Sequence, residues 1–141
     1  MKILRFKNIL WLAAGGFAVV AALFSWAFFI EPSRLVVRGY DLPVRGWSPK
    51  LAGFKIVAVS DIHGGSNFIT EAKIREIVEK ANAQNADIVV LLGDYVSQQR
   101  GERRKLKMPI ATVADNLRGL RANFGVFAVI GNHDNWYDGQ A

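Results

Sequence analysis

The sequence predicts an α/β domain built on parallel strands, preceded by one transmembrane helix. Three observations lead to this fold class. An uncharged apolar run occupies most of the first 30 residues. Three short runs rich in β-branched residues follow it, and two segments with apolar residues at helical spacing separate them. The order strand, helix, strand, helix, strand implies crossover connections and parallel strands.

The charge and the amino-acid composition exclude several classes of protein. The net charge of the 141 residues is +6, and three of these charges, on Lys2, Arg5 and Lys7, precede the apolar run. The surplus that remains is too small to indicate a nucleic-acid partner. Cysteine is absent from the sequence, which excludes disulfides and thiolate metal sites. A metal ion would therefore need oxygen and imidazole ligands.

The apolar run covers residues 9–30 and contains no charge. At about 1.5 Å per residue, a helix of this length spans a hydrocarbon core. Trp11 and Trp26 lie near its ends, where indole rings favour the membrane interface, and Glu31 with Pro32 closes it. Residues 1–8 form a basic flank. We therefore predict a single-pass transmembrane helix.

A cleaved signal peptide is the competing interpretation of this run. Against it, the run is longer than the usual apolar region of such peptides, and no small-residue cleavage site is recognisable near residues 26–30. Basic residues lie on both sides of the run, so the side of the membrane on which the domain lies is left open.

Residues 31–53 are predicted to form a tether, and residues 54–141 the domain. Within the tether, residues 34–44 read as an extended segment interrupted by Gly39 and Pro43, and residues 47–53 as a turn-rich link.

The domain begins with a strand predicted over residues 54–60 and buried on both faces. Thr70 is placed to cap the helix that follows. One face of that helix carries Ile74, Ile77, Val78 and Ala81, and Ile69 is placed to pack against Ile74.

The second strand is predicted over residues 87–92, and a polar loop over residues 95–107 follows it. A second helix starts near Pro109, and residues 125–130 form the third strand. The apolar face of this second helix comprises Ile110, Val113, Leu117 and Leu120. Ligands of parallel sheets bind beyond the carboxyl ends of the strands, so three loops become candidates for the site.

All three of these loops hold residue types that bind metals. The first contains Asp61 and His63, which we predict to lie in an extended stretch and therefore to project to the same side. The second contains Asp94, whose two oxygens can bridge two cations, and the third contains Asn132 with a neutral amide oxygen. Gly93 and Gly131 precede the functional residues, where a tight turn leaves no room for a Cβ atom.

With these three blocks the sequence resembles the calcineurin-like metallophosphoesterase superfamily. The pattern of that superfamily is Asp-x-His, then Gly-Asp, then Gly-Asn-His-Asp or Glu, each after a strand. Here the blocks are Asp61-Ile62-His63, Gly93-Asp94 and Gly131-Asn132-His133-Asp134. Together with the membrane segment, they make the chain most similar to the bacterial membrane-associated phosphodiesterase branch. Some members of that branch hydrolyse the pyrophosphate bond of a lipid A precursor such as UDP-diacylglucosamine.

The resemblance implies a role for each residue. Asp61 and His63 would bind a first divalent ion, Asp94 would bridge two ions, and Asn132 would bind the second. His133 would serve the leaving group, and Asp134 would orient the His133 ring through its other nitrogen. The two ions, which could be manganese, iron, zinc or magnesium, would activate a water molecule for attack on phosphorus.

The resemblance also implies a metal-dependent phosphodiesterase or pyrophosphatase, anchored by its N-terminal helix in a bacterial inner membrane. Its substrate would be a phosphorylated small molecule or a lipid-linked one, and no nucleic-acid partner is expected. The oligomeric state is left open.

The family completes its site with further histidines, a lone one and a Gly-His-x-His block, whereas this sequence contains only His63 and His133. We therefore expect the N-terminal part of the metallophosphoesterase α/β sandwich, with about half of a site. A fragment, a truncated gene model and a naturally short protein all fit this pattern. The alternative function is a non-catalytic, membrane-tethered binding module.

Two further features have competing interpretations. Residues 100–107 carry five basic residues and one acidic residue, and could meet lipid headgroups or a phosphorylated substrate, or form a solvated loop. Trp136 and Tyr137 could line a pocket or belong to the packing.

Overall fold

The computed structural model describes residues 2–138, and within them the side chains of residues 7–102 and 105–137. The chain divides into two compact units, Met1–Val36 and Val37–Ala141. We describe each unit by itself.

The first unit is a single helical segment. The α-helix α1 (Lys2–Ser25) continues into the π-helical turn η1 (Trp26–Ile30) and the 3-10 turn η2 (Glu31–Ser33). Residues Lys7–Ser33 are long and apolar enough to cross a membrane, and the side chains of residues 7–32 are exposed. This agrees with the predicted transmembrane helix, although the helix also takes in most of the basic flank.

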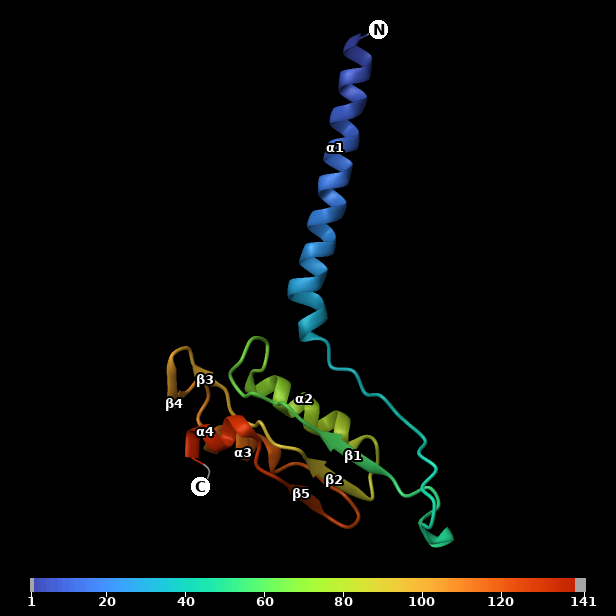
Figure 1. Cartoon of the computed structure of the whole chain (residues 1–141), viewed down its shortest axis with the longest axis vertical. Helices are drawn as coiled ribbons and strands as arrows, with labels where there is room; N and C mark the ends of the chain where they lie inside the picture. Colours follow the sequence, from blue (N-terminus) through green and yellow to red (C-terminus); the bar gives the residue numbers. More distant parts are fainter. Residues whose placement is uncertain (1, 139–141) are drawn as a thin grey trace. The chain divides into compact units, whose positions relative to one another are not determined.

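The second unit contains a three-stranded parallel sheet in the order β1-β2-β5 (Figure 1). Its strands are β1 (Ile56–Val59), β2 (Ile88–Leu91) and β5 (Val126–Ala128). Ile56 pairs with Ile88, and Val89 pairs with Val126. The predicted α/β class and the parallel direction of the strands are confirmed.

Two helices connect these strands, close to the predicted positions. Helix α2 (Glu71–Asn82) begins after Thr70, whose hydroxyl accepts a hydrogen bond from the Lys73 N–H at 3.3 Å. Helix α3 (Ile110–Leu117) begins after Pro109. The predicted cap is therefore present, and Ile69 packs against the core cluster that contains Ile74.

Both helices pack on the same face of the sheet. Val57 and Val59 of β1 lie on this face with Val89 and Leu91 of β2, because alternate side chains of a strand point the same way. The core cluster that they form is completed by Val78 and Ala81 of α2 and by Leu117 and Leu120.

The opposite face of the sheet is exposed, so the prediction that the first strand is buried on both faces is wrong. Ile56 is 48% exposed and Phe127 is 55% exposed. The apolar run in the sequence could not show that α2 and α3 both lie on the other face. Within residues 2–138, no second layer covers this side.

Two elements were not predicted. The polar loop at residues 95–107 contains an antiparallel hairpin of β3 (Gln98–Gln99) and β4 (Glu102–Leu106). The third loop turns directly into the short helix α4 (Asn132–Asp138), which lies against β4 (Figure 1). The hairpin was missed because its strands are polar and basic, without apolar alternation.

The tether of irregular chain contains one 3-10 turn, η3 (Pro49–Leu51), and meets the sheet at the amino ends of its strands. The Trp47 ring packs edge-on against Phe54 at 6.5 Å, and Phe54 stacks on Phe124 at 5.9 Å. Since Phe54 precedes β1 and Phe124 precedes β5, these rings join the tether to two strands.

A carboxylate also ties the strands together at this amino end. Asp87, just before β2, accepts the Lys55 N–H at 2.8 Å and the Asn123 side-chain amide at 3.0 Å. Its backbone carbonyl accepts the Phe124 N–H at 2.8 Å. The Lys55 hydrogen bond, followed by that of Asn123, holds the pKa of Asp87 below its ordinary value.

Candidate metal site at the carboxyl ends of the strands

The loops after β1 and β2 run side by side, joined by backbone hydrogen bonds. The Asp61 N–H donates to the Gly93 carbonyl at 3.3 Å, and the His63 N–H donates to the Asp94 carbonyl at 2.9 Å. One residue further, the Gly64 N–H donates to the Tyr95 carbonyl at 2.8 Å. The two loops therefore hold each other in register beyond the end of the sheet.

Three candidate ligands have left-handed backbone conformations. The φ angles are 55° at Asp61, 46° at His63 and 57° at Asp94. The prediction that Asp61 and His63 lie in an extended stretch is therefore wrong. Residues other than glycine rarely adopt such angles, although Asp and His tolerate them better than most, and such strain gathers at functional sites. The inter-loop hydrogen bonds of the backbone hold these angles.

Gly93 and Gly131 bring the second and third loops into direct contact. A Cβ atom on Gly93 would lie 2.6 Å from the Gly131 Cα atom, and one on Gly131 would lie 2.8 Å from the Asp94 Cγ atom. Real Cβ atoms do not approach other atoms so closely. The expectation that these positions leave no room for a side chain is confirmed.

Asp134 is buried and joins the loops that follow β2 and β5. Its Oδ2 atom accepts the N–H groups of Asp94 at 2.8 Å and Gly131 at 2.9 Å. Its Oδ1 atom accepts those of Tyr95 at 2.9 Å and Val96 at 3.2 Å. The side chain is 7% exposed, so the charge is stabilised by four backbone donors rather than by water.

The side chains of His63, Asp94 and His133 converge on one point. One ligand atom from each of them lies within 4.8 Å of the other two. The Nε2 atom of His63 is 3.8 Å from Asp94 Oδ2 and 3.6 Å from Asp61 Oδ1. The rings of His63 and His133 meet edge to face, with centroids 4.6 Å apart. The structure thus gathers two imidazoles and two carboxylates.

A hydrogen bond of His63 Nδ1 determines which nitrogen of the His63 ring faces the cluster. Nδ1 of His63 is 3.2 Å from the Val96 carbonyl, which can only accept, so Nδ1 carries the proton. A neutral His63 ring therefore presents the lone pair of Nε2 to the two carboxylates. This arrangement is typical of histidines that bind metal ions.

Gln98 holds His133 at two points. Its side-chain nitrogen donates to the His133 carbonyl at 2.6 Å, and its oxygen lies 2.9 Å from His133 Nδ1. The expectation that Asp134 orients the His133 ring is therefore wrong, since both oxygens of Asp134 accept backbone N–H groups. Sequence reasoning missed Gln98 because it lies in the unpredicted hairpin.

The remaining predicted ligands, Asp61 and Asn132, are exposed. Asp61 Oδ2 accepts a hydrogen bond from the Ser60 hydroxyl at 2.5 Å, which leaves Oδ1 toward His63. Asn132 is the first residue of α4 and directly precedes His133.

The donor set fits a divalent cation. Imidazole nitrogen and carboxylate oxygen together suit zinc, iron and manganese, and carboxylate oxygen also suits magnesium. Asp94 has one oxygen, Oδ1, that accepts the His133 N–H at 2.9 Å, and its second oxygen faces His63. These contacts orient the Asp94 carboxylate without the help of a metal ion. The identity of the ion does not follow from these ligands.

The Trp136 ring borders the cluster, and the Tyr95 ring packs against the hydrophobic core. Trp136 lies 4.7 Å from the His133 ring between centroids, so this residue packs against the site. The Tyr95 hydroxyl donates to the Val129 carbonyl at 2.8 Å. Burial raises the pKa of Tyr95, which keeps its hydroxyl neutral.

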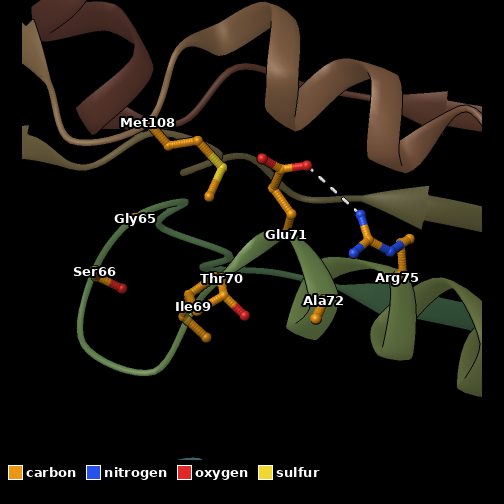
Figure 2. Close-up of a pocket in the computed structure, with 8 residues that line it drawn as sticks. All are labelled: Gly65, Ser66, Ile69, Thr70, Glu71, Ala72, Arg75 and Met108. Carbon is orange, nitrogen blue, oxygen red and sulfur yellow. Dashed lines mark ion pairs between the residues drawn. The ribbon is translucent and has the colours of Figure 1, made fainter.

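An open pocket of about 530 Å³ lies beside the first loop, at the start of α2 (Figure 2). Figure 2 shows Met108 on one side of the pocket and the Glu71–Arg75 ion pair, 3.5 Å long, on another. The pocket is lined by Gly65, Ser66, Ile69, Thr70, Glu71, Ala72, Arg75 and Met108. None of these is a candidate metal ligand, although Gly65 lies two residues after His63.

Comparisons with known proteins show the family to which the chain belongs. The family model for calcineurin-like phosphoesterase matches residues 54–141. A UDP-2,3-diacylglucosamine pyrophosphatase of Chlamydia muridarum is 31% identical over 121 residues. A transmembrane protein with metallophosphoesterase domain of Danio rerio is 29% identical over 115 residues, and an uncharacterized metallophosphoesterase of Bacillus subtilis is 25% identical over 130 residues.

These alignments cover most of this chain but only part of each relative. They include 83%, 82% and 92% of the chain, and 34%, 24% and 43% of the Chlamydia, Danio and Bacillus proteins respectively. No solved structure matches the chain at a significant level.

Proposed function

Because the chain belongs to the calcineurin-like phosphoesterase family, we propose that it contributes part of the site of a membrane-anchored, metal-dependent hydrolase of phosphate esters. One observation carries this proposal. The ligand atoms of His63, Asp94 and His133 come together within 4.8 Å beyond the strands, at the edge where parallel sheets bind their ligands.

In this proposal Asp61, His63 and Asp94 hold one divalent ion, and Asp94 with Asn132 contributes to a second. Such ions supply Lewis acidity, and they lower the pKa of a water molecule that attacks phosphorus. The hydrogen bond between His63 Nδ1 and the Val96 carbonyl fixes the orientation of the ring, so that Nε2 is aimed at the site.

His133 is proposed to act on the leaving group. With Nδ1 held by Gln98 at 2.9 Å, only Nε2 can exchange a proton at the cluster. A protonated His133 would donate that proton to the departing oxygen as the phosphorus–oxygen bond breaks. Gln98 positions the ring, and Asp134 positions the loop that carries it.

For the substrate, we propose a phosphodiester or a pyrophosphate, and within that class a lipid-linked nucleotide such as UDP-diacylglucosamine. The Chlamydia relative named as a pyrophosphatase of that compound supports this choice. A phosphorylated small molecule is the broader alternative. We propose manganese, iron, zinc or magnesium as the ion, and manganese is the one that the test below uses.

The segment Lys7–Ser33 would hold the site at a membrane, and a relative named as a transmembrane protein supports membrane association. We propose that this membrane is a bacterial inner membrane, because the Chlamydia and Bacillus relatives are bacterial proteins.

The test is hydrolysis by the purified full-length protein. We expect turnover of a chromogenic phosphodiester that depends on added Mn²⁺ and falls at least about 100-fold in Asp94→Asn. Asp115→Asn, at an exposed carboxylate paired with Arg118, serves as the control. A protein that binds the ion but shows no metal-stimulated turnover would instead be a membrane-tethered binding module.

A further inference from the structure

Residues 37–53, which we call the juxtamembrane segment, expose an unusual number of large apolar side chains. Every residue of this segment is exposed. Six large apolar side chains in it are between 41% and 78% exposed, namely those of Val37, Tyr40, Leu42, Val44, Trp47 and Leu51. Dense exposed apolar surface of this kind marks a contact with a partner or a membrane.

Basic residues alternate with these apolar ones. The segment contains three basic residues, Arg38, Arg45 and Lys50, and one acidic residue, Asp41, so its net charge is +2. Trp and Tyr are enriched at the level of lipid headgroups, and Lys and Arg close to a membrane are attracted to anionic lipids. The composition therefore fits a lipid surface better than a protein core.

The segment cannot lie far from a membrane that its own chain crosses. It begins four residues after Ser33, the end of the helical segment that is long enough to span one. A fully extended chain advances about 3.3 to 3.6 Å per residue, so Tyr40 is at most about 25 Å from that end. This limit holds for any arrangement of the two units.

The segment is also attached to the domain. Trp47 packs on Phe54, and Phe54 stacks on Phe124, at the amino ends of β1 and β5. The segment is therefore more than a loose linker, because a contact between lipid and Trp47 would be transmitted to two strands of the sheet.

We propose that the juxtamembrane segment lies in the headgroup region of an anionic bilayer. Tyr40, Leu42 and Trp47 insert toward the acyl chains, and Arg38, Arg45 and Lys50 lie among the lipid phosphates. This binding surface does not depend on the proposed enzymatic activity.

The test uses the full chain in vesicles of equal parts phosphatidylglycerol and phosphatidylcholine. Trp11→Phe, Trp26→Phe and Trp136→Phe leave Trp47 as the only tryptophan, whose fluorescence is excited selectively over that of tyrosine. Lipids brominated near the glycerol end of the acyl chain should quench Trp47 about twofold or more. Protein in which Trp136 is the only tryptophan should be quenched far less.

Substitutions in the segment make this test specific. Tyr40→Ser with Leu42→Ser should lower the quenching of Trp47 by about half, and both sites are too exposed, 74% and 78%, to affect folding. The matched pair Leu92→Ser and Val129→Ser, 49% and 56% exposed, should leave it unchanged. Far-ultraviolet circular dichroism checks that each variant is folded.

Two results would overturn the proposal. Trp47 could be open to aqueous acrylamide and untouched by brominated lipid, which would place the segment in water. Trp47 could also be shielded from both quenchers, which would place another part of the protein or a second copy on the segment.

Discussion

Carboxylates join the strands at both ends of the sheet, but the two ends are built differently. At the amino end Asp87 binds one backbone N–H and one side-chain amide. At the carboxyl end Asp134 binds four backbone N–H groups and is almost fully buried. At the carboxyl end three neighbouring residues, Asp61, His63 and Asp94, take left-handed backbone angles, whereas near Asp87 at the amino end Asn85 does so.

The difference between the two ends shows that separate residues stabilise the loops and form the candidate metal site. Asp134 satisfies the backbone of the loops, so the side chains of Asp94, His63 and His133 are left to face one another. Strained residues at this end persist because surrounding hydrogen bonds determine their conformation. The amino end carries no candidate metal ligands, and there Asp87 only links neighbouring strands. Substitutions at the two ends should therefore have unequal effects.

Replacement of the buried carboxylate should have the largest effect. Asp134→Ala leaves four backbone N–H groups without their acceptor, and we expect a loss of about 3 to 5 kcal/mol in the free energy of unfolding. Thermal and denaturant unfolding of the full-length protein measure this loss. Asp115→Asn, at a surface ion pair, should change stability by less than about 0.5 kcal/mol. Equal effects of the two would contradict the assigned role of Asp134.

Glycine substitutions compare the two ends directly. Gly131→Ala forces a Cβ atom against Asp94, and we expect a loss of about 2 to 4 kcal/mol together with weaker metal binding. Gly125→Ala, at φ +110° but with the nearest atom 3.9 Å away, should cost only about 1 to 2 kcal/mol from backbone strain. Unfolding and Mn²⁺ titration test both. A Gly125 variant that loses metal binding as Gly131→Ala does would contradict the comparison.

Gln98 should matter for activity more than for stability. Gln98→Ala releases the His133 ring, and we expect kcat to fall about 10- to 100-fold while KM changes little, as for other residues that orient a site histidine. Gln98→Asn offers the same groups on a shorter side chain and should recover part of the loss. A purely structural role of Gln98 would instead lower the unfolding temperature and kcat together, without recovery by Asn.

The smallest effect belongs to the amino end and depends on pH. The pKa of Asp87 is lowered in the folded state, so its charge stabilises the fold at neutral pH, and this contribution is lost as pH falls through the folded pKa. Asp87→Asn should therefore slightly lower the unfolding temperature at pH 7. The gap to the unsubstituted protein should close as the pH falls below the ordinary pKa of an aspartate and through its lowered pKa in the folded state. A gap that is constant with pH would mean that charge plays no part.

Much of the fold could be predicted, because it rests on local patterns. The Thr70 cap, the helix after Pro109 and the three apolar strands each leave a periodic or capping signal within a few residues. The exposed face of β1 was not predictable in this way, since it depends on where both helices pack.

The site was predictable in its residue types but not in its geometry. The three motifs identified His63, Asp94 and His133, which the structure brings together. The left-handed angle of Asp61 is held by a partner 32 residues away, Gly93, and no local pattern encodes such a contact. The pairing of His133 with Gln98 likewise depends on a hairpin without apolar alternation.

The central claim is that Asp61, His63 and Asp94 hold a divalent cation at the carboxyl end of the sheet. A crystal structure of the full-length protein with Mn²⁺, recorded at the manganese absorption edge, tests it most directly. We predict anomalous density bonded at about 2.0 to 2.3 Å to His63 Nε2 and to a carboxylate oxygen of Asp94. Manganese bound elsewhere, with His63 and Asp94 not coordinating it, would contradict the account.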